Sequence, residues 1–463
     1  MIKPDILSQL QKIIGEEGVL TTKEDLYAYS YDSTATWTHL PDVVVMPTTT
    51  DQISQVLKLA NENKVPVTPR GGGTNVSGGS IPIKGGIVLC TTRMNKILDI
   101  NKTNLTATVE PGVVLQDFNQ ALAKEGLFYP PDPVSFLGCT LGGNVAENSG
   151  GPYCVKYGVT KQYILGLEVV LANGYVMHVG GVTVKNRTGY ELAMLFTGSE
   201  GTLGVITKIT VRLLPMPLAN KTMMAVFDDM AVGGQAVSNI IGRGVVPAKI
   251  EFVDNFVIRR IEEITPMGLP VDAKALLLIQ VDGNPAGAEM DTKQIVDILK
   301  ESGAKNVKVA KDAAEAETYW KMRSAGFAAV FGAAHTVIAE DVAVPRDKLA
   351  EFIKKLEEIS KRTGFFIQYL GHAGDGNLHP SIFTDMRNKE EFERAQETMG
   401  EIFRAAMELG GVLSGEHGIG LEKQRFLKEA MDPVAIDIMK KIKGILDPNN
   451  ILNPGKIWEE GEA

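Results

Sequence analysis

The sequence predicts an α+β protein of two or three domains, and three features of the chain lead to this prediction. From Pro41 to Pro215, short strand-like segments alternate with glycine-rich turns. Segment 214–217 then has the proline-rich composition of a linker. Beyond it, helical and strand-like patterns alternate as far as residue 409. A chain of 463 residues is long enough for two or three compact units.

The first part of the chain has the pattern of strands around an early helix. Stretch 50–64 begins with Thr50 and Asp51, which are suited to capping a helix. Asn173-Gly174 lies between two apolar runs and predicts a two-residue hairpin turn. Runs rich in apolar and β-branched residues predict strands at 42–46, 86–90, 106–110 and 167–171.

After residue 217 the hydrophobic pattern changes, which predicts a second domain. A last segment, 433–456, contains one more helix and the turn-rich stretch 447–450. The elements predicted before it are helices at 254–265, 291–302, 348–363 and 389–409, and strands at 275–281 and 365–370.

Composition and charge limit the classes of partner. Hydrophobic residues make up 44% of the chain and charged residues 22%, which is typical of a globular protein. With 47 basic and 56 acidic residues the formal charge is −9, and no basic run is interleaved with aromatic residues. We therefore expect no binding of nucleic acid. The 48 glycines are a mild excess, which indicates places where the backbone approaches a ligand closely.

The pattern of the chain favours a cytoplasmic protein rather than an exported or integral membrane protein. Its apolar run at 327–339 is shorter than the ~18 residues of a transmembrane helix. Stretch 3–15 is amphipathic and differs from a signal peptide. Cys90, Cys139 and Cys154 have no C-x-x-C spacing, which excludes a disulfide framework, a zinc ribbon and a cysteine-ligated iron–sulfur cluster. Any further electron carrier must then belong to another protein.

Three glycine-rich segments indicate a long ligand. Segment 70–79 follows a short strand, and its glycines let backbone N–H groups turn inward around a pyrophosphate. A surface loop is the alternative for this segment taken alone. Because it opens no helix and lacks the G-x-G-x-x-G order, it favours no Rossmann nicotinamide site. Segments 131–151 and 198–204 have a similar composition, and three such loops suit a dinucleotide.

Six motifs in order resemble one family. They are PRGGGTNVSGG, PPDP followed by TLGGNVAENSGGP, LFTGSEGTLGVIT, YLGHAGDGNLHP, GEHGIG and LDPNNILNPGK, and they extend from residue 41 to 456. Together they resemble the FAD-linked D-2-hydroxy-acid dehydrogenases: D-lactate dehydrogenases, glycolate oxidase FAD subunits and D-2-hydroxyglutarate dehydrogenases. The resemblance implies the vanillyl-alcohol-oxidase-type fold, with two α/β subdomains binding FAD and a cap domain with an antiparallel sheet and helices.

The resemblance also implies domain bounds and flavin-binding residues. An FAD domain would span 1–215, a cap domain 216–425, and a C-terminal segment, 426–463, would return to the FAD domain. Some relatives attach the flavin through a histidine where this chain has Thr74, so non-covalent FAD is expected. The residues expected to contact FAD are Arg70, Gly71, Gly72, Gly73, Thr74, Asn75, Gly78, Pro133, Thr140, Gly143, Asn144, Glu200, Gly204, Ile206 and Asn453.

Three of the six histidines lie in glycine-rich segments near the C-terminus. His372 and His379 flank a glycine-containing loop that can turn both rings towards one ion, and Glu416 precedes His417. Two imidazoles and a carboxylate suit Zn²⁺, Fe²⁺ or Mn²⁺ alike and leave coordination positions open. A packed or hydrogen-bonded histidine is the alternative for each ring taken singly. The resemblance implies that His372, His379 and Glu416 are the metal ligands and that His417 is the general base.

The resemblance further implies a substrate clamp and an electron acceptor. Arg323, in the stretch Trp320 to Arg323, resembles the arginine that binds the substrate carboxylate, with an exposed helical arginine as the alternative. Ser381 follows Pro380 where hydroxyglutarate-type relatives carry an asparagine, which favours D-lactate or glycolate over a dicarboxylate. Electrons are expected to pass to an electron-transferring flavoprotein or a similar carrier. The alternatives are an FAD subunit active only in a larger complex and, more distantly, the non-redox alkyl-dihydroxyacetone-phosphate synthase.

Overall fold

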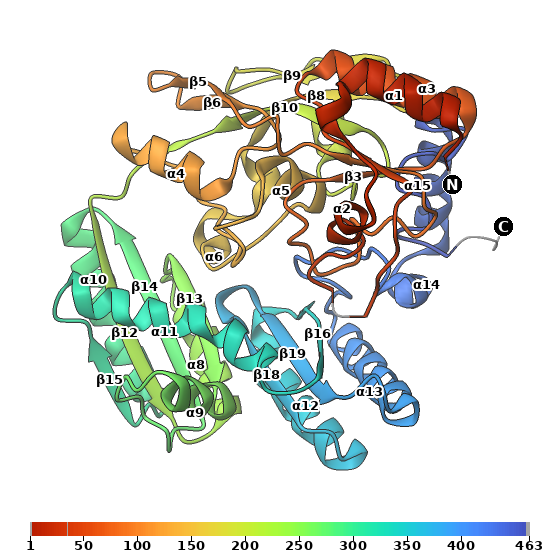
Figure 1. Ribbon diagram of the computed structural model, residues 1–463. Coiled ribbons are helices and arrows are strands. Elements are labelled where there is room, and N and C mark those ends of the chain that lie inside the picture. The colour runs from red at the N-terminus through yellow and green to blue at the C-terminus, as the bar shows by residue number, and fades with distance from the viewer. Residues whose placement is uncertain (1, 35, 460–463) are drawn as a thin grey trace. The chain divides into compact units, whose positions relative to one another are not determined.

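The computed structural model describes residues 2–34 and 36–459. The chain divides into two compact units, whose helices and strands are labelled in Figure 1. Unit 1 consists of residues 1–149, 159–216 and 416–463, and unit 2 of residues 150–158 and 217–415. The C-terminal stretch is therefore part of the same unit as the N-terminal one.

Unit 1 contains a small, mainly parallel sheet. Its strands lie in the order β1-β2-β4-β3, with β2, β4 and β3 parallel and β1 antiparallel to β2. The predicted early helix is α3, but the predicted cap at Thr50 and Asp51 is wrong: Thr49 caps the helix by accepting a hydrogen bond from the N–H of Gln52, and Thr50 is its first residue. The bounds are β1 Val19–Leu20, β2 Val43–Val45, β3 Val67–Arg70, β4 Ile87–Cys90, α1 Pro4–Ile14, α2 Lys23–Ala28 and α3 Thr50–Asn63.

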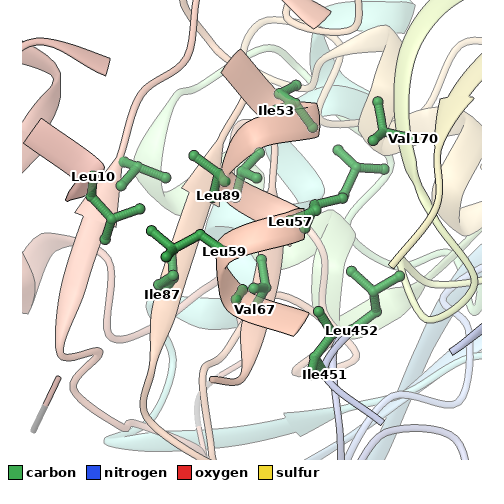
Figure 2. Packing of buried hydrophobic residues seen from close by; sticks show 14 of the residues in the cluster. Leu10, Ile53, Leu57, Leu59, Val67, Ile87, Leu89, Val170, Ile451 and Leu452 are labelled. Carbon is green, nitrogen blue, oxygen red and sulfur yellow. The ribbon is translucent and has the colours of Figure 1, made fainter. Parts of the chain in front are cut away.

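One hydrophobic core joins this sheet to its helices and to the C-terminal stretch. Leu57 of α3 and Leu89 of β4 are fully buried, and Leu452 packs in the same cluster (Figure 2). The backbone N–H of Val67 donates to the carbonyl of Ile451 at 2.7 Å. Burial of a large aliphatic side chain contributes roughly 1.5–3 kcal/mol, so these contacts hold the C-terminal stretch against β3.

The second sheet of unit 1 is antiparallel, in the order β5-β6-β10-β8-β9. The hairpin predicted at Asn173-Gly174 is confirmed, because it joins β8 to β9 and Gly174 has a φ of +83°. The bounds are β5 Ile97–Asn101, β6 Thr106–Val109, β8 Ile164–Val170, β9 Val176–Gly180, β10 Val205–Arg212, α4 Leu115–Lys124, α5 Leu141–Glu147 and α7 Leu192–Phe196.

The linker predicted at 214–217 is wrong in its first half. Residues Leu214–Pro215 form a short strand, β11, which pairs with β7, Leu127–Phe128. Proline is tolerated there because the two-stranded ribbon does not need every backbone N–H as a donor. Unit 1 therefore extends to Met216, and unit 2 resumes at Pro217.

Unit 2 is built on one antiparallel sheet in the order β15-β12-β14-β13-β18-β19-β16, with β17 also pairing with β19. Its neighbouring strands β12 and β14 are the long green arrows of Figure 1. The strands are β12 Ala219–Phe227, β13 Lys249–Asp254, β14 Ala275–Gly283, β15 Asn306–Val309, β16 Thr336–Ala339, β17 Val342–Ala343, β18 Ile367–His372 and β19 Asn377–Thr384. The helices are α6 Cys154–Tyr157, α8 Met230–Gly242, α9 Asn255–Ile264, α10 Pro285–Glu301, α11 Ala313–Phe331, α12 Leu349–Thr363 and α13 Lys389–Glu408.

Helix α10 begins at Pro285 rather than at the predicted residue 291. The signal for its true start is Asn284, whose side chain accepts a hydrogen bond from the N–H of Gly287 at 2.8 Å. Pro285 fits the first turn, where its missing N–H is not needed. Cap and proline together decide this boundary more strongly than the hydrophobic periodicity does.

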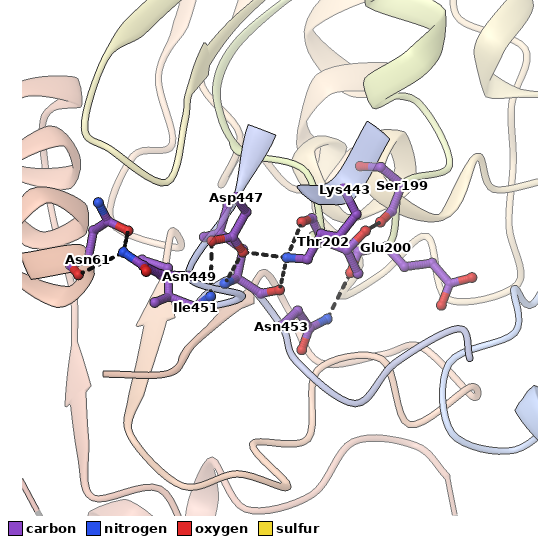
Figure 3. A network of polar contacts seen from close by, with 10 residues as sticks. Asn61, Ser199, Glu200, Thr202, Lys443, Asp447, Asn449, Ile451 and Asn453 are labelled. Carbon is purple, nitrogen blue, oxygen red and sulfur yellow. Dashed lines mark hydrogen bonds and ion pairs between the residues drawn. The ribbon is translucent and has the colours of Figure 1, made fainter. Parts of the chain in front are cut away.

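The C-terminal stretch is held by a buried lysine. Lys443 of α15 donates from Nζ to the carbonyl oxygens of Thr202 and Leu452, each at 2.8 Å, and pairs with Asp447 (Figure 3). Asp447 in turn accepts hydrogen bonds from the N–H groups of Ile451 and Leu452. A buried ion pair with further hydrogen bonds fixes the turn after the helix. The helices of this stretch are α14 Leu427–Ala430 and α15 Pro433–Leu446.

Among the described residues, none of the helices combines the length and the apolar character that crossing a bilayer requires. The described cysteines, Cys90, Cys139 and Cys154, form no disulfide bond.

Candidate active site

The three glycine-rich segments meet in unit 1. A Cβ at Gly71 would lie 2.2 Å from Oγ1 of Thr140, and one at Gly72 would lie 2.2 Å from the carbonyl oxygen of Gly138. Gly73 has a φ of +67°, which favours glycine. Segment 70–79 therefore packs directly on segment 131–151, and only glycines allow so close an approach.

The third segment binds the end of α5. The N–H of Gly198 donates to Val145 O at 2.9 Å, and the N–H of Glu200 donates to Ala146 O at 2.8 Å. A cavity of about 180 Å³ lies between segments of the same unit, with Gly72, Gly138 and Thr140 in its lining. The three loops therefore lie side by side in unit 1, as binding of one long ligand requires.

The three glycine-rich segments, 70–79, 131–151 and 198–204, together form what we call the cradle. Several of its residues fit a bound cofactor. Asn144 is buried, and its Nδ2 has no hydrogen-bond partner among the described residues. A buried donor of this kind requires an acceptor from a ligand or water. Thr140 caps α5 by accepting a hydrogen bond from the N–H of Gly143. Buried Ile206 and closely packed Gly204 lie at the start of β10.

The outer side of the cradle is held by the N-terminal segment. Asn75 donates from Nδ2 to Asp32 at 2.7 Å, and the N–H of Gly78 donates to Thr34 Oγ1 at 2.8 Å. Arg70 donates from Nη1 to the carbonyl of Tyr31 at 2.7 Å. Burial raises the pKa of Asp32. These bonds fix the shape of segment 70–79. In segment 131–151, the carbonyl oxygen of Pro133 accepts a hydrogen bond from the N–H of Phe136.

Asn453 links two of the glycine-rich segments. Its Nδ2 donates to the carbonyl oxygens of Gly79 and Glu200, both at 2.8 Å. Its neighbour Lys456 donates to the carbonyl of Ile81 at 2.5 Å, and burial lowers the pKa of this lysine to about 8. The motif that ends the chain therefore closes the cradle rather than forming a separate tail.

Glu200 holds the loop of residues 416–420, which contains His417, by hydrogen bonds to its backbone. The carboxylate of Glu200 accepts hydrogen bonds from the N–H groups of Ile419 at 2.8 Å and Gly420 at 2.7 Å. Gly418, with a φ of +86°, has no room for a side chain, because a Cβ there would lie 2.7 Å from Glu147 Oε2. Burial raises the pKa values of both Glu147 and Glu200. Glu200 thus positions the loop next to His417.

In unit 2, His372 and His379 lie on paired strands. His372 ends β18 and is in register with Asn377 of β19, and His379 lies two residues further along β19, opposite Leu370. The two rings are 5.1 Å apart between centroids and nearly perpendicular, at 85°. Gly376, with a φ of +75°, makes the tight connection, where a Cβ would lie 2.1 Å from Val344 O. The two histidines, seven residues apart in the sequence, are therefore brought together by the hairpin of β18 and β19.

Glu251 connects His372 to Arg323. Its carboxylate is fully buried, with Oε1 2.7 Å from His372 Nδ1. Arg323 of α11 points Nε and Nη2 at Oε2, each at 2.8 Å. Sequence reasoning missed Glu251, although a single acid in the apolar strand Ile250–Val253 is a signal that a buried partner is present.

Glu416 follows Gly415, whose N–H donates to Asp341 Oδ2 at 2.5 Å. In unit 2, a ring nitrogen of His372 and one of His379 lie within 4.8 Å of each other. That spacing is compatible with one shared divalent cation, because the Zn–N and Zn–O bonds of such sites are about 2.0–2.2 Å long. The donors are borderline in hardness, which suits Zn²⁺, Fe²⁺ and Mn²⁺.

Comparison with known proteins identifies the family. Residues 216–457 match the family described as "FAD linked oxidases, C-terminal domain", and residues 41–180 match "FAD binding domain". The chain belongs to the FAD-linked oxidases. This family assignment makes it an FAD-binding oxidoreductase and confirms the predicted cofactor.

Two curated relatives match this FAD-linked oxidase over almost its whole length. The glycolate oxidase subunit GlcD of Bacillus subtilis is 44% identical over 99% of this chain and 97% of the relative. The D-lactate dehydrogenase of Anaerostipes hadrus is 36% identical over 98% of each chain. Their names support FAD-linked oxidation of a hydroxy acid and leave the individual substrate open.

A solved structure confirms the predicted fold. The structure described as p-cresol methylhydroxylase with substrate bound is similar, with a TM-score of 0.80 and 20% identity, over 99% of this chain and 97% of that one. At this identity the likeness concerns the fold alone. The FAD-linked oxidase therefore has the vanillyl-alcohol-oxidase-type fold, of the α+β class.

Proposed function

We propose that this chain is an FAD-dependent dehydrogenase that oxidises a D-2-hydroxy acid, with D-lactate favoured, to the 2-oxo acid. The observation that carries the proposal is the His372–His379 pair on adjacent strands, with a buried carboxylate joining His372 to Arg323. The relatives named glycolate oxidase subunit and D-lactate dehydrogenase support the same substrate class.

His372, His379 and Glu416 are the proposed ligands of a divalent cation, Zn²⁺, Fe²⁺ or Mn²⁺. Because Nδ1 of His372 faces Glu251, Nε2 is the ring nitrogen whose lone pair we propose as the ligand. Such an ion, when bound, supplies a Lewis acid for the substrate hydroxyl and carboxylate.

His417 and Arg323 are the proposed catalytic residues. A neutral His417 imidazole takes the hydroxyl proton on a ring nitrogen, so it must be unprotonated at the start. Nε of Arg323 donates to Glu251, and Nη2 lies 2.8 Å from the same oxygen as an ion pair without a hydrogen bond, so the guanidinium keeps N–H groups for the substrate carboxylate. Bound FAD would supply the acceptor for the hydride that leaves the substrate Cα. Loss of one proton and one hydride converts the 2-hydroxy acid into the 2-oxo acid.

The proposed flavin contacts are the fifteen residues predicted from the motifs, from Arg70 to Asn453. Their support is the meeting of the three glycine-rich segments and the buried donor of Asn144. Thr74 offers no imidazole for attachment, so we propose that FAD is bound non-covalently. Denaturation in acid should then release all of the yellow colour into the supernatant.

Electrons are proposed to leave for a separate protein in the cytoplasm, such as an electron-transferring flavoprotein. The three cysteines are free and too few to hold an iron–sulfur cluster within this chain. The word "subunit" in the name of the Bacillus subtilis relative supports the existence of a partner.

A second candidate is oxidation of glycolate, which the 44% identity to the glycolate oxidase subunit favours. Glycolate differs from D-lactate only by the absent methyl group. One extra methylene in a pocket changes rates by about 10–200-fold, so the two acids are separable by rate.

The test is anaerobic reduction of the purified, metal-replete yellow protein. D-lactate should bleach the flavin in stopped flow, and L-lactate should do so at least ~10²-fold more slowly. Faster bleaching by glycolate would select the second candidate. If neither acid, nor any other D-2-hydroxy acid, bleached the flavin, the proposed substrate class would be wrong.

A further inference from the structure

We infer that Glu251 is a positioning residue that couples the metal site to the substrate clamp. Its two carboxylate oxygens have different partners: Oε1 faces His372 Nδ1, and Oε2 faces Nε and Nη2 of Arg323. This inference rests on the proposed function, because it assigns the consequences of Glu251 to the proposed ligand His372 and the proposed clamp Arg323.

The contact to His372 selects a tautomer. A carboxylate oxygen accepts a hydrogen bond and cannot donate one when ionised, so Nδ1 of His372 must carry the hydrogen. The lone pair is then on Nε2. Carboxylate–histidine pairs of this kind orient metal-binding imidazoles and raise their basicity, and their loss typically weakens metal binding by 10–100-fold.

The contact to Arg323 selects an orientation of the guanidinium. Nε donates to Oε2 at 2.8 Å and Nη2 lies at the same distance from that oxygen, which fixes the guanidinium against strand β13. Glu251 and Arg323 are 0% and 5% exposed, so removing either one leaves a buried, unpaired charge. One carboxylate therefore fixes both a ligand and a clamp.

A merely structural role is the alternative, in which the Glu251–Arg323 pair only holds α11 on the sheet. The two roles differ in the fate of His372. If the role is only structural, replacing both Glu251 and Arg323 by uncharged side chains should restore the protein. If Glu251 also orients His372, the same replacement leaves His372 without its carboxylate partner.

The experiment compares Glu251→Gln with the wild type by competition between the protein and a chelator for Zn²⁺. We expect affinity for Zn²⁺ to fall by ~10–100-fold and KM for the hydroxy acid to rise, with flavin per chain unchanged. Asp282→Asn is the matched control, because Asp282 is also a buried acid of this sheet, bonded to Lys156 and Tyr157. It should leave Zn²⁺ affinity unchanged.

The double variant Glu251→Gln with Arg323→Gln separates the two roles and covers any loss of stability. We expect its unfolding temperature to recover relative to Glu251→Gln, while Zn²⁺ affinity stays low. Wild-type Zn²⁺ affinity in either variant would overturn the inference and leave the proposed function intact. A wild-type protein that binds none of the three candidate cations would overturn both.

Discussion

At the scale of single residues, buried charges cluster where the chemistry is proposed. Glu251 and Arg323 form a buried pair, and Glu200 is buried beneath the loop that carries His417. Burying a charge is costly unless it is paired and hydrogen-bonded, so each such residue needs a reason. For Glu251 the partners are His372 and Arg323, and for Glu200 they are the backbone N–H groups of Ile419 and Gly420.

Replacing His417 by alanine should slow flavin reduction by ~10²-fold or more, the usual loss for a general base. The flavin should stay bound, because the contacts of Glu200 are to the backbone of Ile419 and Gly420. Stopped-flow reduction with D-lactate measures the rate. His335→Ala, at an exposed position, is the control and should reduce normally; a normal rate in His417→Ala would remove this residue from the mechanism.

Asp254 should make stability depend on pH. Burial raises the pKa of its carboxyl to about 7, although hydrogen bonds from the N–H groups of Val257 and Tyr369 oppose the shift. The folded protein therefore keeps a proton that the unfolded chain releases above about pH 4. The stability due to this proton is complete below about pH 4 and is lost as the pH rises through 7.

Asp254→Asn should flatten the dependence of the unfolding temperature on pH between about pH 4 and 8, since the amide oxygen can still cap α9. Thermal unfolding followed by circular dichroism measures it. Asp229→Asn is the matched control, because Asp229 caps α8 at an exposed position. Equal slopes in wild type and Asp254→Asn would contradict the assignment.

At the scale of elements, the C-terminal helix is an organising part of the flavin-binding unit. Lys443 binds the carbonyl of Thr202, inside the third glycine-rich segment, and Asn453 binds that of Glu200 (Figure 3). Loss of these contacts would loosen the loop between α7 and β10. The C-terminal stretch therefore contacts the third glycine-rich segment, although the two are far apart in the sequence.

Lys443→Met should destabilise unit 1 by ~3–5 kcal/mol, because Asp447 is left as an unpaired buried charge. Flavin content per chain should fall as well. Thermal unfolding and the ratio of visible to ultraviolet absorbance measure the two effects. Lys441→Met is the matched control on the same helix, since its pair with Asp437 is exposed and contributes little. Equal unfolding temperatures for the two variants would refute the role of Lys443.

At the scale of the whole molecule, the chain combines a flavin-binding unit with a second unit that carries both histidines of the proposed metal site. Removing the metal with a chelator should slow flavin reduction by D-lactate without releasing the flavin, because the flavin segments belong to unit 1. Absorbance of the filtrate and stopped-flow rates test this together. Release of flavin along with the metal would contradict separate sites.

The need for a separate electron acceptor is also tested on the whole protein. We expect one round of flavin reduction with the purified chain alone and repeated turnover only after an electron-transferring flavoprotein or a dye is added. Steady-state assays with and without each carrier distinguish this from the alternative complex. A chain that is reduced only after partner subunits are added would support the subunit alternative instead.

Local sequence patterns predicted the longer helices, several of the strands and the glycine-rich segments. The helix after Thr49 and the hairpin at Asn173-Gly174 follow from hydrophobic periodicity, capping and φ preferences, which act over a few residues. The start of α10 was misjudged because a cap and a proline outweighed periodicity. The candidate histidines came from motifs and from the resemblance, since their spacing alone left packed histidines as an alternative.

The partners of the buried charges depend on contacts between distant parts of the chain. Glu251 meets His372 because β13 pairs with β18, and it meets Arg323 because of where α11 packs. Glu200 and Lys443 likewise find backbone partners more than two hundred residues away. Periodicity says which face of an element is buried but not which element covers it. The choice of neighbouring strand and helix is made by the packing of the folded chain, and the proposed roles of these residues follow from that choice.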